Sequence, residues 1–270
     1  MAARMHPKIA VLHVHRYEGP RMYNLLISLA VGIVVALLVK LANFSIWAGL
    51  VPGLIAAVIT FFFLGRRVAG QIQALMTTVQ SDLQSQPTSK KDAEGRVERA
   101  VKTLEKGLVY DKWQFMVGPE IHAQIGMLKY MVKDLDGALV HFKKGSSRNY
   151  MAKAMEGALY FQRNDTPAMK AAFEAAAKSG KKEAIVWAVY AWCLLQKKEK
   201  DEALRVLGRG VEENPKDEKL KASLGQLQND KRLKMKPYEP MWWQFGLETP
   251  PMMPPMGGGG GRRMQFVTRR

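Results

Sequence analysis

The chain has 270 residues and a formal net charge of +17, with one cysteine and five histidines. The single Cys193 excludes an internal disulfide, and so few cysteines and histidines argue against a structural zinc site. The length leaves room for one soluble domain of ordinary size beside a further segment.

The N-terminal part of the sequence predicts a membrane anchor. Residues 1–21 form a basic tail, and two apolar runs without internal charges follow at 25–39 and 46–64. With its flank, each run approaches the roughly 20 residues that cross the hydrocarbon core of a bilayer. We therefore predict a two-helix transmembrane hairpin over 22–64. The alternative is a buried hairpin in a soluble core, but the rest of the chain is not apolar enough to cover it.

The charges around the two runs predict the orientation of the hairpin. Arg66 and Arg67 follow the second run directly, whereas the connection between the runs carries only Lys40. The positive-inside rule then places both termini in the cytoplasm, and we take the bacterial cytoplasmic membrane as the default. Neither run has an acid, a base or a histidine near its middle, which argues against a transporter.

Residues 65–92 are predicted to form an amphipathic stalk and linker. Apolar residues recur there at helical spacing, at positions Val68, Ile72, Leu75, Val79 and Leu83. The stripe has two interpretations. It mediates self-association of two or more chains through 66–86, as in a coiled coil, or it packs on the domain of its own chain.

From residue 93 to 230 the sequence contains no strand signal, and helix-forming residues alternate with short turns. Small residues recur in this region at steps of 31, 34 and 34 residues, at Gly126, Gly157, Ala191 and Gly225. Such a period indicates a repeat of paired helices. The unit around Ala191 has the fullest set of further positions, namely Trp187, Leu194, Ala203, Leu207, Gly210 and Pro215.

This pattern resembles the tetratricopeptide repeat, most closely over residues 187–215. The resemblance implies an all-α solenoid of about three repeats with a capping helix at 218–230, in which small residues let helices A and B approach. The first unit departs from the pattern with Tyr150 in place of the terminal proline. The second has Met169 in place of the small residue of helix B, and the shorter first step predicts a clipped turn.

The resemblance also implies a concave face lined by helix A of each repeat. Few of the residues expected there are charged, and the Lys, Arg and Asn residues with which some family members grip a terminal carboxylate are missing. An apolar groove of this kind suits a helix or an aromatic segment of a protein partner. The candidate protein-binding residues are Met127, Tyr130, Met131, Met151, Phe161, Trp192 and Leu195.

Residues 231–270 form a basic tail rich in proline, glycine and methionine, a composition that predicts disorder. Within it, 238–247 is unusually aromatic for a disordered stretch. We predict that this segment docks in the groove of its own repeat domain unless a partner displaces it; the bilayer interface is the rival site. The candidate docking residues are Tyr238, Trp242, Trp243 and Phe245.

No catalytic constellation is recognisable in the sequence. The glycine run at 257–261 is followed by two arginines and lacks the Lys-Ser/Thr of a phosphate-binding loop. Serines lack a histidine and an acid at readable spacing. We therefore expect no enzymatic activity, no cofactor and no metal site.

Together these features predict a membrane-anchored, tetratricopeptide-like adaptor or scaffold that recruits protein partners at the cytoplasmic face of a membrane. Its basic segments suit anionic lipid headgroups. One alternative is a membrane-tethered RNA binder that uses the basic tail, although nucleic acid is less favoured because repeated Arg-Gly units are absent. Another is a small accessory subunit of a secretion or transport complex.

Overall fold

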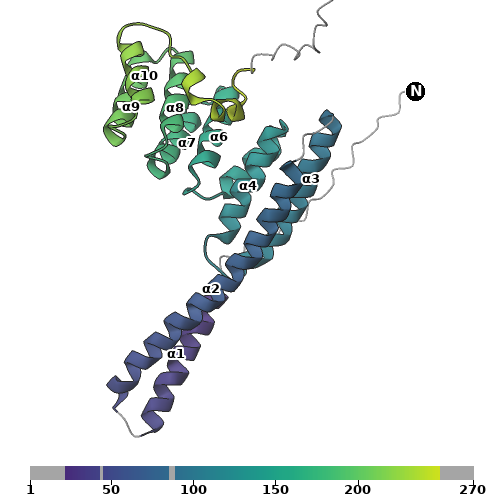
Figure 1. The fold of residues 1–270 in the computed structure, drawn as a ribbon, viewed down its shortest axis with the longest axis vertical. Helices are drawn as coiled ribbons and strands as arrows, with labels where there is room; N and C mark the ends of the chain where they lie inside the picture. Colours follow the sequence, from purple (N-terminus) through teal and green to yellow (C-terminus); the bar gives the residue numbers. More distant parts are fainter. Residues whose placement is uncertain (1–21, 43–44, 85–88, 250–270) are drawn as a thin grey trace, which may run out of the picture. The chain divides into compact units, whose positions relative to one another are not determined.

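The computed structural model describes residues 22–42, 45–84 and 89–249, so the predicted N-terminal tail and residues 250–270 of the predicted C-terminal tail lie outside the described residues. Over these ranges the chain forms ten α-helices and three short 3-10 helices, without strands (Figure 1). The predicted all-α class, with two apolar helices followed by a solenoid-like array, is confirmed. The chain divides into two compact units, Met1–Ser146 and Ser147–Arg270.

The first unit begins with a hairpin of two apolar helices, α1 (Tyr23–Leu41) and α2 (Ile46–Gln84), which lie side by side (Figure 1). Glycines set how closely they approach. A Cβ atom on Gly32 would lie 2.7 Å from the carbonyl oxygen of Gly53, and one on Gly49 would lie 2.7 Å from the carbonyl oxygen of Ala36. Close helix crossings of this kind require small residues at the point of contact.

Helix α2 runs without interruption from the predicted second span through the predicted stalk. Its C-terminal half packs against α3 (Lys90–Gly107), which in turn contacts η1 (Leu108–Lys112) and α4 (Val117–Met131). The shared core of these helices consists of Val79, Val97, Ala100, Val101, Leu104, Ile121, Ile125 and Leu128, with Ile72 and Met76 packed against it.

This core contains or contacts part of the apolar stripe of the stalk. Val68 and Val79 are buried within one chain, and Ile72 packs against the same core. The structure therefore gives the middle of the stripe a partner in its own unit, because α3 and α4 cover it. Self-association through 66–86 would have to use what remains exposed, such as Leu83. The boundary between the two compact units lies after Ser146. It therefore falls inside the region 93–230, which the sequence predicted to be one repeat domain.

Helix starts follow the local sequence closely. Asp134, Asn149, Asp165 and Asp217 each precede a helix, and the side-chain oxygen of each accepts a hydrogen bond from the backbone N–H three residues later. These oxygens satisfy donors that the first turn of a helix leaves without an intrahelical acceptor. The caps place the starts of α5 (Leu135–Lys144), α6 (Tyr150–Gln162), α7 (Thr166–Ser179) and α10 (Glu218–Gln228).

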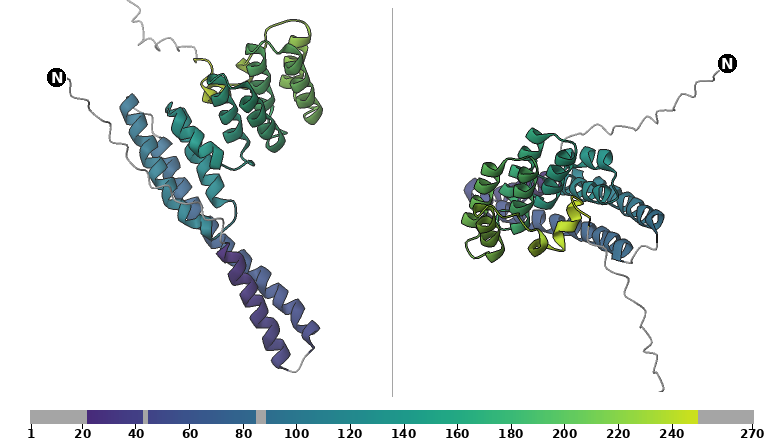
Figure 2. Two further views of the ribbon diagram at one scale, coloured as in Figure 1. Left: turned by 180° about the vertical axis from the view of Figure 1, so that it is seen from behind. Right: turned by 90° about the horizontal axis from the view of Figure 1, so that it is seen from above.

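The second unit contains α6, α7, α8 (Ala184–Gln196), α9 (Lys200–Glu213) and α10, followed by η2 (Lys236–Tyr238) and η3 (Met241–Phe245). Helix α8 contacts both α6 and α10, whereas α7 pairs with α6 and α9 pairs with α8 (Figure 2). In the repeat pattern α6 and α8 are A helices, and α7 and α9 are B helices.

The shorter first repeat has a different cause from the clipped turn that the sequence predicted. Helix α5 has 10 residues, whereas α7 and α9 have 14 each. The first repeat is therefore shorter because its helix B, α5, is shorter. Met169, which stands in place of a small residue in the second repeat, is completely buried. Tyr150, which replaces the terminal proline, is the first residue of α6.

Candidate protein-interaction site

Helix α8 is the centre of the second unit. Ten of its 13 residues are buried, because α6, α7, α9, α10 and η3 all contact it. A helix that is apolar all round belongs in the middle of a packed array or in a membrane, and here its neighbours cover it. The position of α8 fixes the two side chains that define the site, Trp192 and Leu195.

Three aromatic rings form a row across the helix A side of this unit. The ring centroids of Phe161 on α6 and Trp192 on α8 lie 5.7 Å apart with an interplanar angle of 64°. Trp242 of η3 continues the row, 5.1 Å from Trp192 at 62°. Both contacts are edge-to-face, the geometry that aromatic quadrupoles favour. We call Phe161, Trp192 and Leu195 the aromatic groove and residues 238–247 the aromatic segment.

The aromatic segment is held by several buried anchors. Trp242 is 1% exposed and Phe245 is completely buried. The hydroxyl groups of Tyr238 and Ser223 are 2.8 Å apart in a buried hydrogen bond, and burial raises the pKa of Tyr238 to about 12. The indole N–H of Trp242 donates to Glu248 at 3.2 Å, so its one polar atom has a partner.

A cavity of about 330 Å³ remains beside the aromatic groove, at the C-terminal end of α8. Its floor includes Trp192 and Leu195, and Leu227 and Leu233 add further apolar surface. Around it lie the basic side chains of Lys200, Lys231 and Arg232; Lys200 forms an ion pair with Asp230, and Arg232 forms one with Glu248. The site therefore combines an apolar floor with a mostly basic rim, which suits an apolar peptide segment with acidic flanks.

The seven groove residues that the sequence predicted belong to two different compact units. Phe161, Trp192 and Leu195 come together as described above, and Met151 is half-buried on α6. The other three belong to the unit Met1–Ser146. There Tyr130 is a core residue packed on Phe142, with centroids 6.4 Å apart. Met127 is half-buried, whereas Met131 is 60% exposed.

Of the four docking residues predicted in the tail, the structure buries three. Tyr238, Trp242 and Phe245 are buried on the second unit, whereas Trp243 is only half-buried. The displacement of this segment by a partner stays a prediction.

Two further anchors that the sequence did not predict, Leu233 and Met235, are buried just before the segment. A signal for both exists, since they alternate with lysines in the stretch 231–236 as the buried positions of an extended chain do.

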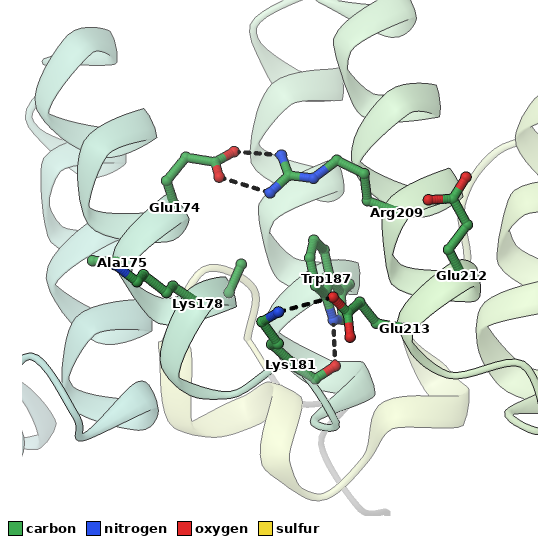
Figure 3. A pocket seen from close by; sticks show the side chains of 9 residues that line it. Glu174, Ala175, Lys178, Lys181, Trp187, Arg209, Glu212 and Glu213 are labelled. Carbon is green, nitrogen blue, oxygen red and sulfur yellow. Dashed lines mark hydrogen bonds and ion pairs between the residues drawn. The ribbon is translucent and has the colours of Figure 1, made fainter.

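A second, larger cavity of about 830 Å³ lies between α7 and α9 (Figure 3). It is lined by Glu174, Ala175, Ala177, Lys178, Lys181, Trp187, Arg209, Glu212 and Glu213. Both signs of charge occur, and several of the groups pair with one another across the cavity. It therefore offers neither an apolar floor nor a surface of one sign, and it is the poorer candidate for a binding site.

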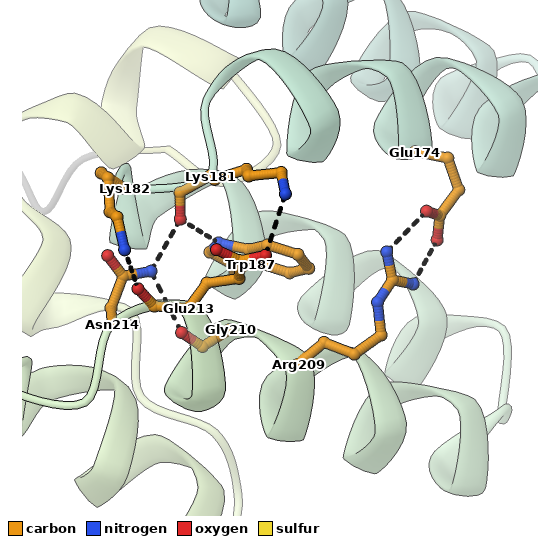
Figure 4. A network of polar contacts seen from close by, with 8 residues as sticks. All are labelled: Glu174, Lys181, Lys182, Trp187, Arg209, Gly210, Glu213 and Asn214. Carbon is orange, nitrogen blue, oxygen red and sulfur yellow. Dashed lines mark hydrogen bonds and ion pairs between the residues drawn. The ribbon is translucent and has the colours of Figure 1, made fainter.

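The polar contacts of this cavity clamp the second and third repeats together (Figure 4). Arg209 donates two hydrogen bonds of 2.8 Å to the carboxylate of Glu174, which lower the pKa of that carboxyl. The same guanidinium lies 5.3 Å from the ring centroid of Trp187. The indole N–H of Trp187 and the side-chain amide of Asn214 both donate to the carbonyl oxygen of Lys181, at 3.0 and 2.7 Å.

Cys193 is buried in α8, and burial raises the pKa of its thiol, which disfavours the reactive thiolate. Within the described residues, no group of three or more His, Cys, Asp or Glu side chains is placed to hold a metal ion.

The helix geometry agrees with a comparison against protein families. Residues 160–227 match the tetratricopeptide repeat family. This match supports the resemblance of residues 160–227 to the tetratricopeptide-repeat superfamily. It extends from the end of α6 to the end of α10 and so contains Phe161, Trp192 and the clamp around Trp187. No curated protein matches the chain.

Proposed function

We propose that the protein is a membrane-anchored tetratricopeptide adaptor that recruits protein partners at the cytoplasmic face of a membrane and performs no catalysis. The observation that carries this proposal is the row of rings in which Trp242 rests on Trp192. It indicates that the helix A side of the repeats accepts an aromatic peptide segment. Tetratricopeptide repeats generally mediate protein–protein interaction, and a segment seated by a few aromatic anchors is suited to displacement.

The side chains of the hairpin support the anchor. The buried residues of α1 are Asn24, Ser28 and Gly32, whereas its exposed residues are mostly leucine, isoleucine and valine. This is the reverse of a soluble amphipathic helix, which buries its apolar face. Both α1 and α2 are long and apolar enough to cross a membrane. In the apolar 18-residue stretch of each helix, only 17% and 11% of the residues are buried. A core helix of a soluble protein would be mostly covered.

The groove is tested in cells by photo-crosslinking. A crosslinkable amino acid is placed at Leu195, which lines the cavity beside the groove, and in a control at Ala171, an exposed position on α7. We expect Leu195 to crosslink to a defined protein, and more strongly when Trp242→Ala weakens the aromatic segment. Equal crosslinking from both positions, or no effect of Trp242→Ala, would contradict a partner site in the aromatic groove.

The anchor and its orientation are tested separately. The chain should stay in the membrane fraction after carbonate extraction. The proposed topology, with both termini cytoplasmic, rests on the arginines that follow the second apolar run. A reporter fused after Arg270 that requires export should therefore be inactive, and activity of such a reporter would refute the orientation.

A further inference from the structure

The junction between the apolar hairpin and the rest of the first unit has an unusual construction. The loop after η1 returns to the point where α1 begins. There the backbone N–H of Asn24 donates to the carbonyl oxygen of Trp113 at 3.2 Å. The rings of Tyr23 and Trp113 meet edge to face, with centroids 5.5 Å apart. The junction thus lies where the first apolar run begins and the second ends, beside Arg67 of α2.

Unpaired polar atoms gather at this junction. Asn24 is 1% exposed, yet neither the nitrogen nor the oxygen of its side-chain amide has a hydrogen-bond partner. The side-chain oxygen of the neighbouring Gln114 is also buried without a partner, and the described residues contain no other buried side-chain atom of this kind. A buried polar group without a partner destabilises the folded state. The buried amide of Asn24, without a partner for either of its polar atoms, therefore indicates a ligand-binding site at this junction.

A cavity of about 300 Å³ opens at the same place, and Asn24 lines it. Arg67, Gln71 and Tyr110 contribute the other polar groups, and Leu64, Val68 and Trp113 complete the wall. The phenol of Tyr110 lies 3.5 Å from the side-chain oxygen of Gln71. No carboxylate lines the cavity. An amide, a guanidinium and a phenol are hydrogen-bond donors that match the oxygens of a phosphate group.

The surroundings distinguish a lipid from a free phosphate. Val109 on η1 is 64% exposed, and Trp113 and Phe115 on the loop that follows are 38% and 53% exposed. Exposed aromatic residues at this level are typical of the membrane interface. Beyond them the exposed apolar faces of α1 and α2 begin, with Leu26 and Phe61 among their residues. These faces offer a path for acyl chains that a free anion would not use.

We propose that this cavity binds the phosphodiester headgroup of an anionic phospholipid. Arg67 pairs with the phosphate, the amide of Asn24 hydrogen-bonds a headgroup oxygen, and the acyl chains lie along the exposed faces of the hairpin. A basic pocket at the ends of membrane helices is a known form of lipid recognition. The proposal rests on the proposed membrane anchor and adds to it a defined lipid site.

The test uses the full chain, purified in mild detergent and freed of lipid. Native mass spectrometry measures binding of phosphatidylglycerol and phosphatidylcholine, with inorganic phosphate as competitor. We expect selective binding of phosphatidylglycerol and a loss of about tenfold or more in affinity for Arg67→Gln and for Asn24→Leu, as expected for losing a hydrogen bond to a charged group. Arg66→Gln is the matched control, because it removes the same charge one residue away from the lining.

Several outcomes would overturn the proposal. Equal losses for Arg66→Gln and Arg67→Gln would show diffuse attraction to a basic surface, and equal binding of the two lipids would show a purely apolar contact. Full displacement by millimolar phosphate would assign the site to a free anion. Helical circular dichroism checks folding of each variant. If carbonate extracted the wild-type chain, the anchor would fail, while selective binding lost in Arg67→Gln would still support the cavity.

Discussion

Gly157 and Gly225 occupy the same position of the repeat, yet we predict opposite effects of replacing each with alanine. On α6 a Cβ atom at Gly157 would lie 2.7 Å from a ring carbon of Phe173, closer than van der Waals contact allows. Phe173 cannot withdraw easily, because it is completely buried and stacks on Tyr190 with centroids 5.1 Å apart. On α10 nothing lies within 4 Å of a Cβ atom at Gly225.

The magnitudes follow from two terms. Alanine in place of a helical glycine stabilises a helix by about 0.5–1 kcal/mol, and this gain applies to both positions. Overpacking of a tight core costs about 1–3 kcal/mol, and this cost applies at Gly157 alone. The two variants should therefore differ by about 1–3 kcal/mol in the free energy of unfolding, with Gly225→Ala more stable than the wild type.

Thermal unfolding of the full chain in detergent measures this difference. Intrinsic fluorescence is a suitable signal, because Trp187, Trp192 and Trp242 are all buried in the second unit. A difference of 1 kcal/mol shifts the Tm of a cooperative unit of 60–100 residues by about 4–8 °C. If Gly157→Ala raised the Tm as much as Gly225→Ala, the close approach of helices A and B in the second repeat would be refuted.

Four further variants test other parts of the fold by thermal unfolding of the full chain, followed by helical circular dichroism where the variant lies in the first unit. Trp187→Ala should cost about 3–5 kcal/mol and Ala203→Leu about 1–3 kcal/mol, and near-wild-type values for both would mean a wrong repeat register. Burial, and then nearby positive charge, lowers the pKa of His141 to about 4. The unfolded chain therefore binds a proton first, so stability falls as the pH drops from 6.5 towards 4, and His141→Gln should reduce this loss. Gly53→Leu should open the hairpin, seen as a lower Tm, whereas an unchanged Tm would contradict the close crossing.

Much of the fold is readable from short stretches of sequence. The 34-residue spacing around Ala191 indicated the repeats, and the capping residues Asp134, Asp165 and Asp217 mark where helices begin. Both signals are local, since a cap acts within one turn and a repeat reuses the same pair of helices. The length of α5 was not readable in this way. A shortened repeat is equally compatible with a shorter turn or a shorter helix.

The candidate site was readable only in part. The sequence indicated that Trp242 and Phe245 need an apolar surface, and it named Trp192 among seven groove residues. It did not indicate that Tyr130 is a core residue while Trp192 carries the aromatic segment. Both sit on A helices with similar neighbours along the chain. Their difference comes from residues far away in the sequence, which periodicity does not report.

What the sequence alone determined is the list of elements: an apolar hairpin, an amphipathic continuation, paired helices and an aromatic tail. Hydropathy, helical period and capping are properties of neighbouring residues, so they can be read from the sequence without a structure. The tertiary structure decided which surfaces meet. It set the stalk stripe against α3 and α4, placed Trp242 on Trp192, and left Asn24 buried without a partner beside Arg67. Each of these depends on packing between segments distant in the chain, where shape and burial choose among faces that look alike in sequence.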